Sequence, residues 1–361
     1  MTHDLDLFYL QHALSLAKIR LGFCAPNPSV GAVIVKNEKI IASGYHLQAG
    51  APHAEIAALQ ALKESANGAT LYVTLEPCCH FGKTPPCTDA LIKADVSRVV
   101  YGYRDPNPIV SGNGEVALTK AGIACEYVAS PEITRFYEGY HYWQRTKKPF
   151  ITAKIAISLD GKIARANGEP IAITGAELKK FTHECRKQSD AILTTVQTII
   201  HDDPQLNVRY QNETMAKSIY ILDRELRIAP TATIFKSAKT ITLFHSNKIT
   251  NTHFSDLGIR CVGIEEDNNG LNLSQIIQII GEDGIHHLWV EAGGKCFTSF
   301  LRQKLLQRAL IYIAPRWIGE GKPMITDNKD ISFIDKAIQW KQMGNDVYCS
   351  IEFHENRHCE E

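Results

Sequence analysis

A chain of 361 residues is long for a single hydrophobic core and predicts about two domains. Its 39 basic and 39 acidic residues cancel, which excludes the basic footprint expected of a nucleic-acid-binding protein. No apolar run approaches the ~18 residues of a membrane span, and the acidic first residues lack the apolar stretch of a secretory signal. We therefore expect a cytoplasmic protein whose ten cysteines are reduced thiols.

The first part of the chain alternates between helical and β-type patterns, which is typical of an α/β domain. Its expected elements are helices at 4–21, 53–65 and 131–144, and strands at 30–35, 39–43, 71–75, 99–101 and 125–128. The strand at 71–75 delivers Glu76, Pro77 and Cys78 at its carboxyl end, where open α/β sheets bind ligands.

The stretch from His53 to Cys87 holds the residues that point most directly to chemistry. It offers an imidazole at His53 and thiols at Cys78 and Cys87, a ligand set that suits Zn²⁺. Catalytic zinc sites use three protein ligands and leave a fourth position open. Glu55 follows His53 at a helix start and need not ligate, so it can shuttle protons as in the H-x-E…P-C signature of zinc deaminases. The stretch therefore predicts a catalytic zinc.

A structural zinc knot is the alternative interpretation of the same stretch. Structural sites normally have four ligands, and Cys79 or His80 can be the fourth. Glu55 has no role in that version, which favours the catalytic site and makes Cys79 a small neighbour. The gap between Cys78 and Cys87 is also much longer than the P-C-x-x-C spacing of nucleobase deaminases.

Two asparagines, Asn27 and Asn107, are each flanked by prolines. Pro-Asn-Pro by itself is a rigid turn. Beside a zinc site, however, a fixed amide can hydrogen-bond the edge of a pyrimidine, because it carries both donors and an acceptor. We keep both residues as candidate substrate contacts.

The pattern changes after the basic, proline-ended stretch 145–149, which predicts a linker. The expected elements beyond it are helices at 176–188 and through 305, and strands at 150–157, 191–194, 218–222, 240–244, 287–290, 309–314 and 347–353. The Glu291–Lys295 run joins a strand to a helix, and backbone N–H groups at that helix start can hold a phosphate beside Lys295. Arg186 and Arg209 can also bind a phosphate as two-pronged forks, although either alone is more often a surface ion pair.

Several motifs occur together over nearly the whole chain. In the first half they are Pro26-Asn27-Pro28, Gly44-Tyr45-His46, His53-Ala54-Glu55, Thr74–Cys78 with Thr84–Cys87, and Asp105–Pro108. In the second half they are Lys154 with Ser158–Gly161, Ile173-Thr174-Gly175, Arg186 with Ser189–Leu193, Asp202-Asp203-Pro204, and Glu291. In these motifs the chain resembles the bifunctional deaminase–reductases of riboflavin biosynthesis.

The resemblance implies an α/β fold in two parts. Residues 1–146 are then a cytidine-deaminase-like α/β/α domain, and residues 149–361 a dihydrofolate-reductase-like α/β domain. The implied activities are zinc-dependent hydrolytic deamination of 2,5-diamino-6-(5-phosphoribosylamino)pyrimidin-4-one and reduction of its ribosyl group to ribityl with NADPH. A small phosphoribosylaminopyrimidine is thus the expected partner, with neither nucleic acid nor membrane, and a homo-oligomer is compatible with the sequence.

The resemblance also implies roles for individual residues. It matches His53, Cys78 and Cys87 to zinc ligands and Glu55 to the catalytic proton shuttle. It matches substrate contacts to Asn27, His46, Asn107, Arg186, Leu206, Arg209 and Glu291. It matches cofactor contacts to Lys154, Ala156, Thr198, Asp202, Gly293, Gly294 and Lys295.

The chain departs from this family in its reductase half. Pro170 and Ala172 stand where the family usually has a serine and a tryptophan. Loss of the aromatic ring predicts a weaker hold on NADPH, unless Ile171 or Trp289 fills the gap. Three rivals remain: a deaminase with a degenerate reductase domain, a zinc deaminase of a free or tRNA base, and a structural zinc or binding protein.

Overall fold

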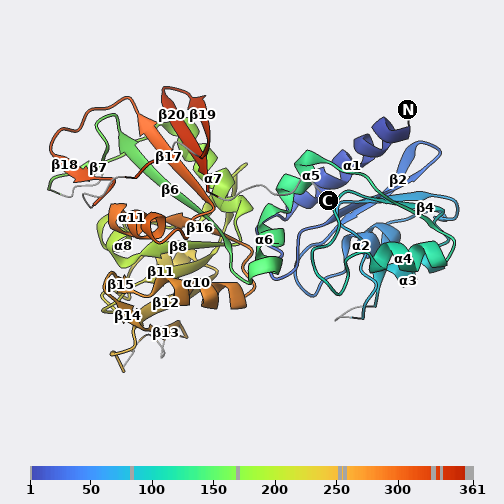
Figure 1. The fold of residues 1–361 in the computed structure, drawn as a ribbon, viewed down its shortest axis with the longest axis horizontal. Helices are drawn as coiled ribbons and strands as arrows, with labels where there is room; N and C mark the ends of the chain where they lie inside the picture. Colours follow the sequence, from blue (N-terminus) through green and yellow to red (C-terminus); the bar gives the residue numbers. More distant parts are fainter. Residues whose placement is uncertain are drawn as a thin grey trace. The chain divides into compact units, whose positions relative to one another are not determined.

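The computed structural model describes residues 2–81, 85–167, 171–250, 254, 258–326, 331–333 and 336–353. The chain divides into two compact units, Met1–Lys147 and Lys148–Glu361, and the division falls within the basic stretch 145–149. Each unit is built on its own sheet, with helices packed against it (Figure 1).

The first unit has a five-stranded sheet in the order β2-β1-β3-β4-β5. β1 is antiparallel to β2 and β3, whereas β3, β4 and β5 run parallel. The strands are β1 (Gly31–Lys36), β2 (Lys39–Tyr45), β3 (Thr70–Val73), β4 (Arg98–Tyr101) and β5 (Ala124–Tyr127). The helices are α1 (Thr2–Ile19), α2 (Ala54–Gln60), α3 (Cys87–Lys93), α4 (Asn113–Lys120), α5 (Pro131–Phe136) and α6 (Glu138–Thr146).

Side chains that alternate along the strands give this sheet two buried faces. In β1, Ala32 and Ile34 belong to one core, while Val33 and Val35 belong to the other. Helices α2, α3 and α4 supply the first core, and α1, α5 and α6 supply the second. The unit is therefore an α/β/α sandwich, as the resemblance implied.

Gly44 sets the position of α2, the helix that carries the predicted zinc-site residues. A Cβ at Gly44 would lie 2.3 Å from the backbone nitrogen of Ala58, so only glycine lets β2 and α2 pack this closely. The predicted end of this helix at Ser65 is wrong, since α2 ends at Gln60. The N–H of Ala61 divides between two carbonyls there, which is the tightened last turn of a helix that stops.

The second unit has a nine-stranded sheet in the order β13-β12-β11-β8-β16-β6-β17-β20-β19. From β13 to β17 neighbouring strands are parallel, so their carboxyl ends share one edge, and only β17, β20 and β19 pair antiparallel. The strands are β6 (Phe150–Ser158), β8 (Ala191–Thr195), β11 (Ser218–Leu222), β12 (Thr240–Ser246), β13 (Arg260–Ile264), β16 (His287–Glu291), β17 (Arg308–Ala314), β19 (Ala337–Met343) and β20 (Asp346–Glu352). The helices are α7 (Ala176–Gln188), α8 (Val196–Asp202), α9 (Ile234–Ser237), α10 (Leu273–Glu282) and α11 (Gly294–Arg302).

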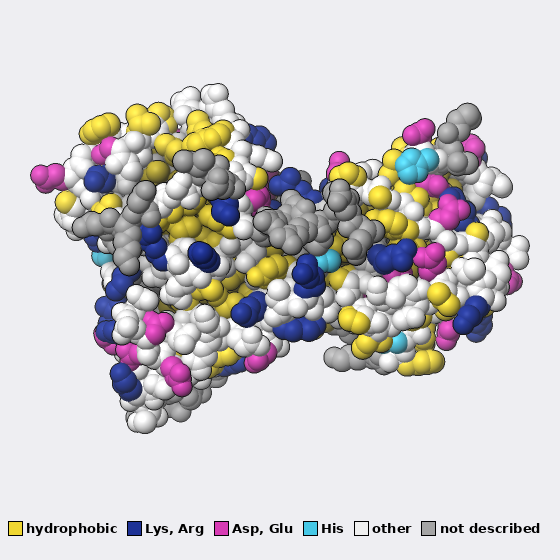
Figure 2. Space-filling view, in the orientation of Figure 1, with side chains coloured by type: hydrophobic (Ala, Val, Ile, Leu, Met, Phe, Trp, Pro, Cys, Tyr) yellow, Lys and Arg dark blue, Asp and Glu magenta, His cyan; other side chains and the backbone are white. Residues whose placement is uncertain are grey.

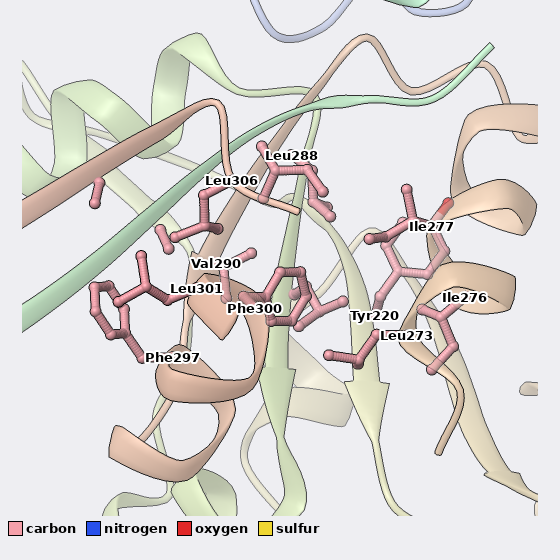
Figure 3. Close-up of a cluster of buried hydrophobic side chains, with 14 of the residues drawn as sticks. Tyr220, Leu273, Ile276, Ile277, Leu288, Val290, Phe297, Phe300, Leu301 and Leu306 are labelled. Carbon is pink, nitrogen blue, oxygen red and sulfur yellow. The ribbon is translucent and has the colours of Figure 1, made fainter. Parts of the chain in front are cut away.

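Strand β16 shows how both faces of this sheet are filled. Leu288 and Val290 pack with α10 and α11, whereas Trp289 between them joins the core under α7, α8 and α9. Figure 3 shows side chains of α10 and α11, among them Ile277 and Phe300, gathered over β11 and β16. Burial on both faces leaves the strand ends as the place for a ligand.

Some strands are not predictable from the sequence, because their residues show little alternation between apolar and polar side chains. Three short pairs lie outside the main sheets: β7 (Lys162–Arg165) with β18 (Gly321–Pro323), β9 (Val208–Tyr210) with β10 (Glu213–Met215), and β14 (Glu266–Asp267) with β15 (Gly270–Leu271). Edge strand β19 was also missed, because nearly all of its side chains are exposed and no alternation results.

Basic and acidic side chains are interspersed on the face of the molecule that Figure 2 shows, in keeping with the zero formal net charge. This face therefore lacks the broad basic area that a nucleic-acid partner favours. Among the described residues, no helix combines the length and the apolar character needed to cross a membrane.

Candidate active sites

Three elements bring the predicted zinc ligands together in the first unit. His53 caps the start of α2, Cys78 follows strand β3, and Cys87 is the first residue of α3. Nδ1 of His53 lies 3.5 Å from Sγ of Cys78 and 3.3 Å from Sγ of Cys87. In the described part of the chain these three form the metal-binding group, with ligand atoms within 4.8 Å of one another.

These separations fit zinc. Bonds of about 2.3 Å to sulfur and about 2.0 Å to nitrogen, set at a tetrahedral angle, place nitrogen and sulfur about 3.5 Å apart. The backbone N–H of Cys87 also donates to Sγ of Cys78 at 3.4 Å, and such a donor favours the thiolate that a metal needs. Cys79 lies outside the group, and three ligands are the number that leaves one position of a catalytic zinc open.

The two thiols affect each other's protonation. A hydrogen bond from Cys87 lowers the pKa of Cys78 to about 4. The same contact raises the pKa of Cys87, and burial adds to the rise. One thiolate therefore forms readily, and a cation between the sulfurs stabilises the second.

Glu55 lies in the first turn of α2 with its side chain buried. Burial raises the pKa of its carboxyl to about 7, and the negative charge of Cys78 contributes to the rise. A carboxyl that titrates near neutral pH can both take up and return a proton, which general acid–base catalysis requires.

His46 lies beside His53 and contacts Asn27. The ring of His46 meets that of His53 edge to face, with centroids 5.7 Å apart. Its Nδ1 lies 3.0 Å from the carbonyl of Pro52, so Nδ1 carries the proton and Nε2 accepts from Nδ2 of Asn27 at 3.1 Å. Burial lowers the pKa of His46 and keeps it neutral. The amide of Asn27 is thus held in one orientation next to the site.

The loop that carries Asn107 is held by a residue that the sequence analysis left without a role. Oδ1 of Asn107 accepts the N–H of Ile109 at 3.2 Å, which closes a local turn. Glu76 is buried just after β3, and its carboxylate accepts three backbone N–H groups of the loop, those of Asp105 at 3.3 Å and of Gly112 and Gly114 at 3.1 Å. The sequence did offer a signal for this role of Glu76. An acidic residue inside the Thr74–Cys78 motif, next to a buried strand, is itself expected to be buried, and a buried carboxylate needs hydrogen-bond donors.

All seven predicted cofactor contacts of the second unit line one cavity of about 1070 Å³. They are Lys154 of β6, Ala156 of β6, Thr198 and Asp202 of α8, and Gly293, Gly294 and Lys295 at the start of α11. The volume is at the upper end of the roughly 300–1,000 Å³ of small-molecule sites, which suits a large ligand. Gly293 and Gly294 line the cavity at the start of α11, where backbone N–H groups can hold a phosphate.

A buried ion pair joins Glu291, which lines this cavity, to Arg186. Arg186 donates from Nε and Nη2 to the two carboxylate oxygens of Glu291, at 2.7 and 2.8 Å. Its Nη1 donates to the carbonyl of Asn207 at 3.0 Å, and Nε1 of Trp289 donates to Glu291 at 2.6 Å. Burial opposes the charge of Glu291, but Arg186 outweighs it and lowers the pKa to about 2. The fork of Arg186 is therefore directed at Glu291, while Glu291 and Lys154 line the cavity.

Arg209 is the second arginine predicted to bind a phosphate, and it is more exposed than Arg186. Its backbone N–H donates to Nδ1 of His183 at 3.1 Å, and its guanidinium lies 3.4 Å from Nε2 of the same ring. Burial and two neighbouring arginines lower the pKa of His183 to about 4, so the ring is neutral. Leu206, which is buried, has a φ of 46°, a left-handed conformation that costs a branched residue strain. His183 had no sequence signal apart from its position one turn before Arg186.

Ala172 is not among the described residues that line the cavity. Its side chain is exposed and its carbonyl accepts from Nη1 of Arg316 at 2.8 Å, whereas Ile171 and Ile173 line the cavity. The wall predicted for an aromatic ring is thus made by isoleucine side chains. Pro170 lies outside the described residues.

Comparisons with known proteins agree with this geometry. The family model for the cytidine and deoxycytidylate deaminase zinc-binding region matches residues 4–103, and the model for the RibD C-terminal domain matches residues 149–349. The chain is 41% identical over 324 residues to the riboflavin biosynthesis protein RibD of Aquifex aeolicus, covering 89% of this chain and 90% of that protein. It is 37% identical over 327 residues to RibD of Escherichia coli, covering 87% and 89%.

Solved structures give the same result for the fold. RibD of Acinetobacter baumannii matches with a TM-score of 0.85 and 35% identity, over 97% of this chain and 99% of that chain. The diaminohydroxyphosphoribosylaminopyrimidine deaminase/5-amino-6-(5-phosphoribosylamino)uracil reductase of Thermotoga maritima matches with a TM-score of 0.85 and 30% identity, over 98% and 99%. Similarity at this level spans both units.

Proposed function

The chain belongs to the RibD family of bifunctional deaminase–reductases of riboflavin biosynthesis, and from that premise we propose how its residues share the two reactions. Its cofactors are Zn²⁺ for the first unit and NADPH for the second, and its substrate is a small pyrimidine. We propose that this pyrimidine is 2,5-diamino-6-(5-phosphoribosylamino)pyrimidin-4-one, which loses its 2-amino group as ammonia before its ribosyl group is reduced to ribityl.

In deamination, His53, Cys78 and Cys87 hold the metal. A Zn²⁺ held there makes water acidic enough to supply a hydrolytic nucleophile at neutral pH. Glu55 takes a proton from the attacking water and returns one to the leaving amino group, for which its pKa of about 7 is well placed. The amides of Asn27 and Asn107 hydrogen-bond the pyrimidine edge, and His46 fixes the first of them.

In reduction, NADPH supplies the hydride, and the protein positions the cofactor and the substrate. The start of α11, with Gly293, Gly294 and Lys295, binds the cofactor's phosphates. Glu291 accepts three hydrogen bonds from Arg186 and Trp289 and also lines the cavity, where its carboxylate can accept a hydrogen bond from a sugar hydroxyl. Arg209 binds the substrate's phosphate.

The observation that carries this proposal is the trio His53, Cys78 and Cys87 with zinc-like separations beside the buried Glu55. The test supplies the diaminopyrimidine ribotide with and without NADPH and follows ammonia release and NADPH oxidation separately. We expect ammonia in both cases and NADPH oxidation only after deamination. A protein that releases no ammonia is not this deaminase, and one that releases ammonia but never oxidises NADPH has a degenerate reductase.

We further propose that the two units work as separable domains with a boundary near residue 147. Support comes from the division of the fold between Lys147 and Lys148. A fragment of residues 1–147 should melt cooperatively and release ammonia without any nicotinamide cofactor. A fragment that does not fold would contradict the boundary. We also propose that the protein works in the cytoplasm, where cysteine thiols stay reduced.

A further inference from the structure

His183 of α7 and Arg209 of β9 are in contact, one helical turn from Arg186. His183 and Arg186 are three positions apart on α7, so their side chains lie on the same face of the helix. The side chain of Arg209 is exposed, whereas the ring of His183 is buried. A ligand that reaches the guanidinium of Arg209 from solvent therefore also comes within reach of the imidazole.

A backbone hydrogen bond decides which nitrogen of His183 carries the proton. The N–H of Arg209 donates to Nδ1 at 3.1 Å, so Nδ1 is the acceptor of the ring. Burial and the charges of Arg186 and Arg209 lower the pKa of His183 to about 4, so near pH 7 the ring is neutral and carries a single proton. That proton therefore lies on Nε2, which acts as a donor.

In the described part of the chain, Nε2 of His183 faces other donors. Nε and Nη2 of Arg209 both lie 3.4 Å from it, and a guanidinium has no acceptor to offer. Neither side chain can satisfy the other, so the contact is unfavourable unless an acceptor bridges the two. An anion with several oxygens bridges them best, because its hydrogen bonds to both donors are strengthened by charge.

The charges around this contact favour an anion over a neutral acceptor. Among the residues that the structure describes, Arg209 pairs with no carboxylate, and its Nη1 donates to the amide oxygen of Gln205 at 3.3 Å. Lys179, which lies one turn earlier on α7 than the ring, adds its positive charge to that of Arg186. Glu291 is the opposing charge, and it is already paired with Arg186. Positive charge is thus in excess where the two donors meet.

We propose that His183 is a second ligand of the substrate's phosphate and donates from Nε2 to the group that Arg209 also binds. This inference rests on the proposed function, which assigns that phosphate to Arg209. A phosphate can accept from both side chains, because each of its oxygens has free lone pairs. One tautomer serves both bonds, so the ring holds the backbone of Arg209 through Nδ1 while Nε2 binds the ligand.

Two amide substitutions separate the two bonds of the ring. The polar atoms of asparagine lie one bond beyond Cγ, as Nδ1 does, whereas those of glutamine lie one bond further, as Nε2 does. His183→Asn therefore keeps an acceptor for the backbone of Arg209 and offers no donor at the position of Nε2. His183→Gln keeps that donor and loses the acceptor near Nδ1. A ring that merely supports β9 would tolerate asparagine better than glutamine, and the inference predicts the reverse.

Calorimetric titration of the full chain with ribose 5-phosphate measures the effect. His183→Asn should weaken binding by about 10- to 100-fold, the usual effect of losing a hydrogen bond to a charged group, whereas His183→Gln should stay within about threefold of wild type. Inorganic phosphate should rank the variants in the same order. His245→Asn is the matched control and should bind like wild type, since His245 is also buried with Nδ1 bonded to the backbone but lies on β12.

Arg209→Gln distinguishes a failure of this inference from a failure of the proposed function. Wild-type protein that binds no ribose 5-phosphate, or Arg209→Gln protein that binds it as wild type does, would contradict the proposed phosphate site. A loss in Arg209→Gln together with wild-type affinity in His183→Asn would overturn the inference alone. Equal losses in the two His183 variants would also overturn it, because they would mean that the ring matters only for the local fold.

Nitrogen NMR of the histidine rings tests the inference in the wild-type protein. The signals of His183 are identified by their absence in His183→Gln, and at pH 7 they should show a ring protonated at Nε2. The Nε2 signal should shift when inorganic phosphate is added. A ring protonated at Nδ1, or an Nε2 signal that phosphate leaves unchanged, would overturn the inference.

Discussion

The two units hold their chemistry in different ways. In the first, three atoms that could hold a metal lie within 4.8 Å of one another, and the buried carboxyl of Glu55 stands two residues from His53. In the second, the contacts are spread over strand ends and a helix start around a cavity of about 1070 Å³. The first site depends on a few indispensable atoms, whereas the second shares its work among many partly redundant contacts.

This difference predicts how each unit responds to substitution. A metal site loses a large part of its binding energy with any one ligand, because three donors cannot be replaced by two. A dinucleotide cavity loses affinity in small steps, since each contact contributes a little.

The largest effect is expected from Cys87→Ser. The purified wild-type chain should contain about one Zn²⁺, and the variant should contain almost none and release no ammonia, since a serine hydroxyl is a poor substitute for a thiolate. Metal analysis measures the first and an ammonia assay the second. Cys79→Ser is the control and should keep its zinc. The ligand assignment is wrong if the control loses zinc and Cys87→Ser retains it.

The second largest effect is expected from Glu55→Gln. The amide keeps the size of the side chain and cannot accept or return a proton, so ammonia release should fall by about 10⁴-fold, the upper end for general acid–base catalysis, because both transfers are lost. Zinc content and melting temperature should not change. Residual activity above about a tenth of wild type would contradict the role of Glu55 as the proton shuttle.

The compact site of the first unit was also easier to predict from the sequence than the extended site of the second. Both cofactors could be predicted because the zinc motif lies in one short stretch and the family motifs span the chain, whereas the zinc ligands and the role of Glu55 stay predictions. The α/β/α arrangement could be predicted too, since alternation in strands such as β1 is strong. The comparisons confirm the family, the fold class and the cofactors.

What could not be predicted depends on contacts between distant residues. Arg186 and Glu291 are 105 positions apart, and nothing in either neighbourhood shows that the fork of Arg186 turns to a carboxylate. Glu76 reaches a loop up to 38 positions away, and the ring of His183 accepts from a backbone donor 26 positions away that no side-chain pattern reveals. Exposed elements such as β19 carry no periodicity to detect.

Glu291→Gln tests the buried pair and should destabilise the second unit. In the folded protein the pKa of Glu291 is about 2, below its ordinary value of 4.5, because Arg186 and Lys154 outweigh burial. Its charge therefore stabilises the fold above pH 4.5, and this contribution is lost as the pH falls toward 2. The variant leaves Arg186 buried without its counter-charge, at a cost of about 3 kcal/mol near pH 7.

Calorimetric melts of wild type and Glu291→Gln at pH 7 and pH 3 provide the measurement. The gap in free energy of unfolding should narrow at pH 3, because at that pH the carboxyl of Glu291 is protonated in the unfolded chain, where its pKa is 4.5, while it is still mostly ionised in the folded protein. Glu282→Gln, an exposed substitution on α10, should show no gap at either pH. A gap that is equal at both pH values would mean that packing, not charge, explains the loss.

The smallest effect concerns the wall of the reductase cavity, where two neighbouring positions can be set against each other. Ile171 lines the cavity, whereas the side chain of Ala172 is exposed. Ile171→Ala removes apolar surface from a partly open site, which costs about 1 kcal/mol and should raise the KM for NADPH about fivefold. Ala172→Trp should change that KM by less than about threefold, since a ring attached there need not enter the cavity. Steady-state kinetics with NADPH as the varied substrate measures both.

If Ala172→Trp tightens NADPH binding tenfold and Ile171→Ala has no effect, the aromatic wall typical of the family is needed after all. The extended site would then depend on a single contact as heavily as the zinc site depends on each of its ligands.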